Sequence, residues 1–143
     1  WQHMEENRLS YDISLKDPVT CETLELASEH MVRGGTYAVG GTRELWLNIT
    51  YNYGRWYRRG EAFDKEGIRT IYGLTGAESI PVLQRAIDAL TALEEDLPAE
   101  ELKELEDQGV TGYWLPTREN AIRPLHQLLA FARLRPDGVW DGD

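Results

Sequence analysis

Residues 33–57 read RGGTYAVGGTRELWLNITYNYGRWY, and this stretch sets the expected fold. Gly-Gly-Thr occurs in it twice, starting at Gly34 and at Gly40, and paired glycines supply the positive-φ positions of a tight turn. After the second copy, apolar residues alternate with others over 44–49, which predicts a strand with its leucines and isoleucine facing the core. Together with a partner strand over 37–39, the stretch predicts an antiparallel pair of strands.

A second alternating pattern precedes this stretch. Over residues 9–16, Leu, Tyr, Ile and Leu alternate with Ser, Asp, Ser and Lys, which predicts a half-buried strand. Asp17 and Pro18 then form a turn signal, and residues 23–26 are expected to return as a further strand. The sequence therefore predicts a small antiparallel sheet of three to four strands in the N-terminal half.

Two main helices are expected after the strands. Thr75 and Glu78 have the spacing of a capping box, and the apolar stripe that follows predicts a helix over about 78–93. A second apolar stripe predicts a helix over about 118–135, although Pro124 should bend this helix or delay its start. Because strands precede helices, the predicted fold class is α+β, with both helices packed on one face of the sheet.

Shorter elements complete the prediction. Aromatic residues recur at helical spacing over 51–59, which indicates a short helix there. Residues 98–107 are expected to form a short surface helix, and residues 137–143 are expected to form a solvated, turn-rich tail. Cys21 lies in the first predicted turn, at a position that glycine would suit better.

The composition is that of one domain. The chain has 143 residues, 41% of them hydrophobic, and it has no apolar run of roughly 18 residues that would span a membrane. We interpret residues 1–3 as cloning residues before Met4, residues 4–143 as a single domain, and the start of the chain as lacking a secretory leader. The single cysteine, Cys21, cannot form an internal disulfide, which favours a reducing, cytoplasmic location.

Negative charge is concentrated in residues 94–109. The whole chain carries a net charge of −10, and this segment holds eight acidic residues against one base, Lys103. A protein with this net negative charge is poorly suited to bind duplex nucleic acid. An acidic segment can instead contact a basic protein surface or imitate the phosphates of DNA, although it can also be a solvated helix and loop that keeps the protein soluble. The candidate partner-binding residues are Glu94, Glu95, Asp96, Glu100, Glu101 and Glu104.

A small-ligand site is a second hypothesis. The two Gly-Gly-Thr copies and their arginines can form a nest of backbone N–H groups for an anion, and the asparagines near the tryptophan can hydrogen-bond the edge of a nucleotide base. The same residues can equally serve as hairpin turns, core aromatics and helix caps. The candidate ligand-binding residues are Arg33, Gly34, Gly35, Thr36, Arg43, Trp46, Asn48 and Asn52.

No set of residues in the sequence defines a reaction. His30 and His126 have no partner at metal-ligand spacing, so no metal site is expected. Cys21 is a poor candidate for a nucleophile because it lies in a predicted turn with no adjacent base. The three aspartates of residues 137–143 lack the length and the closing glutamate of a calcium loop. We therefore expect neither a catalytic residue nor a cofactor.

Five stretches of the chain form a recognisable set: YDISL (11–15), RGGTYAVGGT (33–42), LNITYNYG (47–54), GIRTIYGLTGAESIP (67–81) and RPDGVWDGD (135–143). As a set they resemble a family of small uncharacterised proteins encoded on bacteriophages and integrative mobile elements of bacteria. The resemblance covers most of the chain, brings no catalytic residues with it, and implies an accessory protein of a mobile element. Residues 94–109 look longer and more acidic than is usual for this family, which marks them as an insertion.

We therefore expect a non-enzymatic binding protein of a phage or mobile element that inhibits or modulates a bacterial defence protein, of the anti-CRISPR or DNA-mimic type. Its partner would be a host protein, with tryptophan and tyrosine anchoring the contact while the acidic segment steers it. The alternative is a binder of a nucleotide-like messenger, or a small enzyme, with its site at 33–56. A third interpretation is a homo-oligomeric assembly subunit, for which the sequence gives no specific sign.

Overall fold

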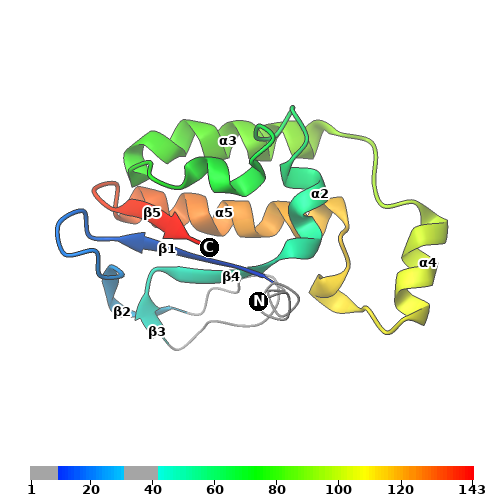
Figure 1. The fold of residues 1–143 in the computed structure, drawn as a ribbon, viewed down its shortest axis with the longest axis horizontal. Helices are drawn as coiled ribbons and strands as arrows, with labels where there is room; N and C mark the ends of the chain where they lie inside the picture. Colours follow the sequence, from blue (N-terminus) through cyan, green and yellow to red (C-terminus); the bar gives the residue numbers. More distant parts are fainter. Residues whose placement is uncertain (1–9, 31–41) are drawn as a thin grey trace, which may run out of the picture.

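The structure is a computed structural model that describes residues 10–30 and 42–143 (Figure 1). Its fold class is α+β, as predicted, because the described residues form small antiparallel sheets and a set of α-helices. The predicted strand over 37–39 and the first Gly-Gly-Thr copy, 34–36, lie outside the described residues.

The strands form two antiparallel sheets. Those in the described residues are β1 (Ser10–Lys16), β2 (Glu25–His30), β3 (Thr42–Glu44), β4 (Trp46–Thr50) and β5 (Val139–Gly142). The main sheet has the order β4-β1-β5, and β2 pairs with β3 in a separate two-stranded sheet. In the main sheet, Ile13 lies opposite Leu47 on one side of β1, and Leu15 lies opposite Trp140 on the other side.

Two long helices cover one face of the main sheet (Figure 1). They are α3 (Gly76–Ala92) and α5 (Arg118–Leu134), which pack side by side and agree with the two predicted main helices. The shorter elements are the 3-10 turns η1 (Tyr51–Tyr53), η2 (Gly67–Ile71) and η3 (Gly112–Trp114) and the helices α2 (Gly54–Tyr57) and α4 (Ala99–Asp107).

The core lies between the helices and the main sheet. Along β1, Tyr11, Ile13 and Leu15 are at most 3% exposed, whereas Asp12 is exposed on the opposite face. The inward-facing leucines and isoleucine predicted for residues 44–49 are fully buried, which confirms that prediction. Burying one such side chain stabilises the fold by about 1.5–3 kcal/mol, so this face of the sheet holds α3 and α5 in place.

Both long helices begin with a capping residue, and the cap of α3 is the one that the sequence predicted. The Thr75 hydroxyl accepts from the Glu78 N–H at 3.0 Å, and the Glu78 carboxylate accepts from the Thr75 N–H at 2.9 Å, which completes a capping box. Thr117 caps α5 in the same way through the N–H of Asn120 at 3.2 Å. Capping residues of this kind stabilise a helix by about 1 kcal/mol, so the two helix starts are fixed locally.

Pro124 does not delay the start of α5. The helix begins at Arg118 and runs through Pro124, which excludes the later start that the sequence left open. A proline inside a helix removes one backbone hydrogen bond and disturbs the carbonyls of the preceding turn. In that turn the buried Tyr57 hydroxyl donates to the carbonyl of Ala121 at 2.7 Å, which supplies this part of the helix with a donor from outside.

The C-terminal residues are not the solvated tail that the sequence predicted. They form β5, whose Trp140 is 1% exposed and donates from its indole N–H to the Ser79 hydroxyl at 2.8 Å. The other edge of β5 is covered as well, because Trp140 exchanges backbone hydrogen bonds with Gly73 and Leu74. The strand is therefore enclosed by β1 on one side and by the segment before α3 on the other.

The turn after β1 also differs in part from the prediction. Cys21 has a φ of 62°, in the left-handed region, so glycine would indeed suit this position better. The expected return strand does not continue along β1: the ladder stops at a single bridge between Lys16 and Thr23, and β2 then pairs with β3. Asp17 holds the turn by accepting from two successive backbone N–H groups.

Candidate functional site

A long connection between α3 and α5 is the most distinctive surface feature of the molecule. We call residues 93–117 the arm; it contains α4 and η3. Neighbouring antiparallel helices are commonly joined by roughly 2–8 residues, so the arm is much longer than the connection requires. Figure 1 shows α4 standing apart from the paired helices, and none of its residues is buried. α4 therefore contributes no buried residue to the core.

The arm carries most of the net negative charge of the protein. It contains the eight acidic residues of the predicted acidic segment, and three of them, Glu95, Asp96 and Glu101, have partners in the structure. The remaining five form no ion pair with any residue that the structure describes: Glu94, Glu100, Glu104, Glu106 and Asp107. These carboxylates are exposed and available to a partner.

Residues 51–59, which we call the platform, hold the C-terminal half of the arm. Asn52 donates from its side-chain amide to the carbonyl of Trp114 at 2.7 Å. The Tyr53 hydroxyl donates to the carbonyl of the preceding residue, Tyr113, and the Trp56 indole N–H donates to the carbonyl of Pro116 at 2.9 Å. Three side chains of the platform thus satisfy three backbone carbonyls of the arm and fix the course of its chain.

Burial further favours the neutral, hydrogen-bond-donating form of two platform tyrosines. It raises the pKa of the Tyr53 hydroxyl above its ordinary value of 10.0. Burial likewise raises the pKa of Tyr57, whose hydroxyl reaches the carbonyl of Ala121 in α5. Because both phenols stay neutral at physiological pH, they remain hydrogen-bond donors, and the platform holds the arm without depending on their ionisation.

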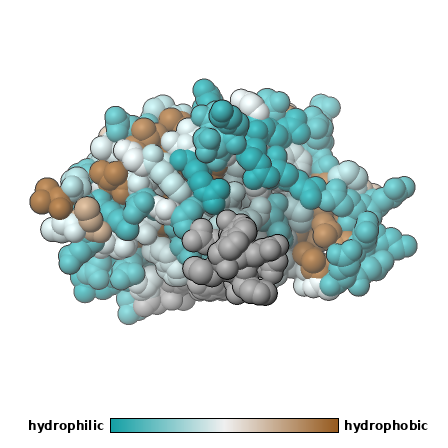
Figure 2. Space-filling view, in the orientation of Figure 1, coloured by the Kyte–Doolittle hydropathy of each residue, from teal (hydrophilic) through white to brown (hydrophobic). Residues whose placement is uncertain are grey.

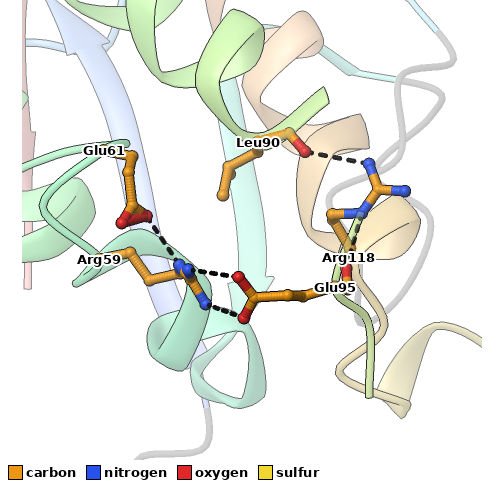
Figure 3. A network of polar contacts seen from close by, with 5 residues as sticks. All are labelled: Arg59, Glu61, Leu90, Glu95 and Arg118. Carbon is orange, nitrogen blue, oxygen red and sulfur yellow. Dashed lines mark hydrogen bonds and ion pairs between the residues drawn. The ribbon is translucent and has the colours of Figure 1, made fainter. Parts of the chain in front are cut away.

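Arginines fasten the N-terminal half of the arm (Figure 3). The Arg59 guanidinium contacts both oxygens of Glu95, at 3.1 and 3.2 Å, and also binds Glu61. Arg118 donates to the carbonyl of Leu90 at 3.0 Å and to the carbonyl of Glu95 at 3.1 Å. The end of α3, the start of α5 and the first residues of the arm are therefore tied together at one point.

A further ion pair reaches α4 itself. Arg55 in α2 contacts Glu101 at 2.6 Å, and this hydrogen bond lowers the pKa of the Glu101 carboxyl. Exposed pairs of this kind contribute only about 0–1 kcal/mol. Their effect here is to orient α4 relative to the platform rather than to stabilise the fold.

A cleft of about 350 Å³ lies between the platform and the arm. Its arginines are already paired with carboxylates, and the ring of Trp56 is only 4% exposed, so it cannot offer a stacking surface to a base. The arginines and glutamates of this cleft are therefore already paired with one another. Its lining residues are Arg55, Trp56, Arg59, Glu95, Asp96, Leu97, Pro98 and Glu101.

The structure does not bring the predicted ligand-binding residues that it describes into one pocket. Arg43 donates to the carbonyl of Leu26 at 3.0 Å and lies 3.7 Å from Glu25, so it links β3 to β2. Trp46 is half-buried in β4, and Asn52 is bound to the arm. The remaining candidates, Arg33, Gly34, Gly35 and Thr36, lie outside the described residues.

Asn48 links the two N-terminal strands of the main sheet. Its side chain is 4% exposed and donates to the Ser10 hydroxyl at 2.7 Å and to the Asp12 carboxylate at 2.8 Å, both in β1. Its amide oxygen is buried and has no hydrogen-bond partner in the part of the chain that the structure describes. Asn48 and Asn52 therefore serve different contacts, one across the sheet and one toward the arm.

Sequence reasoning missed the residues that position the arm. Arg55 and Arg59 were not identified, although residues 55–59 hold three arginines beside aromatic residues. A signal was available, because an acidic segment attached to a folded body calls for nearby positive charge. The positions that those arginines would contact could not be predicted, because they depend on where the arm leaves α3.

Within residues 10–30 and 42–143, no helix is long and apolar enough to cross a membrane. The same part of the chain has no group of three or more His, Cys, Asp or Glu side chains that could hold a metal ion. Comparison with protein-family models, with curated proteins and with solved structures gives no match for this chain.

Proposed function

We propose that this chain is a non-enzymatic binding protein of a phage or mobile element, which uses its arm to engage a basic host protein in the cytoplasm. The consequence for the host would be inhibition or modulation of a defence protein. The mobile-element origin follows from the resemblance of the sequence stretches described above, and the binding role follows from the arm. The proposal thus joins a sequence resemblance to a structural feature.

One observation carries the binding role: α4 has no buried residue, and yet the arm that contains it is attached at several points. A helix that served only solubility would gain nothing from being oriented. Here three platform side chains bind the carbonyls of residues 113, 114 and 116, and Arg55 orients α4 through Glu101. A preorganised element loses less conformational entropy when it binds, which is the expected use of such an arrangement.

The charge of the arm selects the class of partner. Five exposed carboxylates have no ion-pair partner among the described residues; four of them lie in α4, and Glu94 lies five residues before it. The negative charge of the arm repels nucleic acid and acidic proteins. It attracts a basic groove on a partner, and such attraction raises the rate of encounter by about 10–1,000-fold at low salt. A nuclease or another DNA-binding protein has a surface of this kind, so the proposed partner is one that normally binds nucleic acid.

The test compares two variants with the same net charge. In the first, Glu100→Gln, Glu104→Gln and Glu106→Gln neutralise exposed carboxylates of α4; in the second, Glu22→Gln, Glu29→Gln and Glu66→Gln neutralise exposed carboxylates elsewhere. Immobilised proteins would capture partners from a bacterial lysate at low and high salt, with the captured proteins identified by mass spectrometry.

We expect the unmodified protein and the second variant to retain the same basic protein at low salt, and the first variant to lose it. Added heparin, a polyanion, should displace that protein. If the two variants retain the same set of proteins, or if capture does not weaken with salt, the arm is not the binding element.

A second candidate function, binding of a nucleotide-like messenger, is favoured by the buried amide oxygen of Asn48, which has no hydrogen-bond partner among residues 10–30 and 42–143. A ligand N–H group could satisfy this oxygen. Native mass spectrometry of the protein beside its Asn48→Ala, Arg33→Ala variant tests this function. A small mass that accompanies only the unmodified protein would support it, and identical spectra after desalting would remove it.

A further inference from the structure

We infer that the arm receives an amphipathic helix of its partner, with one apolar face flanked by lysine or arginine. This inference rests on the proposed function and deepens it, because it names the kind of segment that the arm binds. It follows from an apolar stripe on α4, from a tryptophan in η3 whose backbone is held in place, and from the acidic residues beside the stripe.

The apolar part of the arm begins on one face of α4. Leu102 and Leu105 are three positions apart, so they lie on the same face of the helix, and both are half-buried. The N–H of Val110 donates to the carbonyl of Leu105 at 2.9 Å, which turns the chain back after α4. Figure 2 shows hydrophobic atoms gathered between α4 and the body of the molecule. One face of α4 is thus partly apolar.

Trp114 adds a large aromatic side chain to the arm. It is 36% exposed, and the other large exposed hydrophobic residues of the described ranges are Val19 and Leu134, which belong to other parts of the chain. An exposed tryptophan is unusual in a surface segment that is otherwise strongly acidic. Tryptophan is also the residue type most enriched among those that dominate binding energy at protein interfaces.

The backbone around Trp114 is held in place. Its own carbonyl accepts from Asn52 at 2.7 Å, and the carbonyl of Tyr113 accepts from the Tyr53 hydroxyl. The indole, about a third of which is exposed, is therefore carried on a turn whose backbone is held in place. A side chain held in this way loses little further freedom when a partner covers it, so the geometry is suited to an anchor.

Acidic residues flank the apolar face. Glu106 is four positions after Leu102, and Glu101 is four positions before Leu105, so each lies beside the leucine stripe on α4. Glu106 has no ion-pair partner among the described residues, whereas Glu101 is paired with Arg55. A binding segment that matches this surface needs apolar side chains in its centre and positive charge at its border.

These features distinguish the amphipathic helix from other occupants. A purely cationic chain would leave the exposed parts of Leu102, Leu105 and Trp114 uncovered. A second copy of this protein would bring another net charge of −10 to the same surface. A helix with leucine-like residues at intervals of three and four can contact the leucine stripe and the indole. Lysine or arginine beside those residues can pair with the flanking carboxylates.

The probes for the test are three fluorescein-labelled peptides, each of about 18 residues, or five helical turns. The first places leucine and lysine so that they segregate on opposite faces of a helix; the second has the same composition in scrambled order; the third is oligolysine. Fluorescence anisotropy measures their binding to the unmodified protein and to three variants: Trp114→Ala, Trp114→Phe and Val19→Ala. Circular dichroism of each variant establishes that it is folded.

We expect the amphipathic peptide to bind more tightly than the other two, and Trp114→Ala to weaken it by about tenfold. Trp114→Phe should recover part of this loss, and Val19→Ala, at an exposed site far along the chain, should change nothing. If all three peptides bind alike and Trp114→Ala has no effect, the inference is wrong while the acidic arm remains a binding element. If no peptide binds, the inference is wrong, and the lysate capture described above decides separately whether the arm binds a basic protein.

Discussion

The helix α4 and the strand β5 are both short and acidic, and each contains only two large apolar side chains, but they have opposite positions in the molecule. In β5, Trp140 is 1% exposed and the strand is part of the main sheet. In α4, no residue is buried, and the helix stands apart from the body (Figure 1). Local composition therefore does not decide which of the two enters the core.

The difference lies in where each backbone finds its hydrogen bonds. A helix satisfies its N–H and C=O groups internally, so α4 needs only attachment points at its ends. A strand must find partners on its edges. In β5 those partners are β1 on one side and residues 73–75 on the other. A polar helix can thus stand exposed to solvent at little energetic cost, whereas a polar strand has to pair with other strands or segments.

The largest effect is expected at Trp140, which would break the comparison if it were small. Trp140→Ala removes a buried indole and the hydrogen bond that its N–H donates to the Ser79 hydroxyl. We expect a loss of about 3–5 kcal/mol in the free energy of unfolding, measured by urea denaturation. A loss below about 1 kcal/mol would mean that β5 is only an appendage, like α4.

A smaller effect is expected at Gly142 in β5. A Cβ atom there would lie 2.7 Å from the backbone carbonyl oxygen of Asp12 and 2.6 Å from the Tyr72 hydroxyl. Gly142→Ala should therefore reduce the free energy of unfolding by about 1–3 kcal/mol. Gly60→Ala is the matched control, because a Cβ there meets nothing within 4 Å. Equal stability of the two variants would contradict the close packing of β5 against β1.

A leucine pair sharpens the contrast from the side of the arm. Leu105 in α4 is only half-buried, so Leu105→Ala should reduce the free energy of unfolding by less than about 1 kcal/mol. Leu125 in α5 is fully buried, and the same substitution there should cost about 2–5 kcal/mol. Chemical denaturation of both variants makes the comparison, and similar losses at the two positions would place α4 in the core.

The smallest effect concerns the fastening of α4. Arg55 lowers the pKa of the Glu101 carboxyl from its ordinary value of 4.5. A lowered pKa means that the pair is fully formed above 4.5 and is lost as pH falls through the lower value. NMR titration of the Glu101 carboxyl should therefore give a midpoint below 4.5, and Arg55→Ala should raise it. Unchanged midpoints would show that the pair does not hold α4 in solution.

Much of the fold was predictable because its signals are local. The capping box at Thr75 and the alternation over 44–49 act within a few residues, and the structure confirms both. β5 was missed for the opposite reason. Its four residues are too few to show a period, and its stability comes from β1, which precedes it by more than a hundred positions. Its place was thus fixed by long-range pairing that the local pattern does not contain.

The candidate site was predictable only in part. The acidic surface helix over 98–107 was expected from its composition, and it is present as α4. The aromatic and asparagine residues of the platform suggested a ligand pocket, because side chains that bind a base and side chains that bind backbone carbonyls are of the same kinds. Asn52 reaches an arm carbonyl that is distant in sequence. Only the course of the arm in the structure shows that these side chains bind backbone carbonyls rather than a base.

The tie between the two long helices has an evolutionary consequence. Arg118 binds the carbonyls of Leu90 and Thr91, so the ends of α3 and α5 are joined independently of what connects them. The entropy of closing a connecting segment grows slowly, and doubling its length costs only about 0.6 kcal/mol. One inserted module can therefore be exchanged for another at this junction. A lineage could acquire a new partner by such an exchange while the sheet and its two helices stay unaltered.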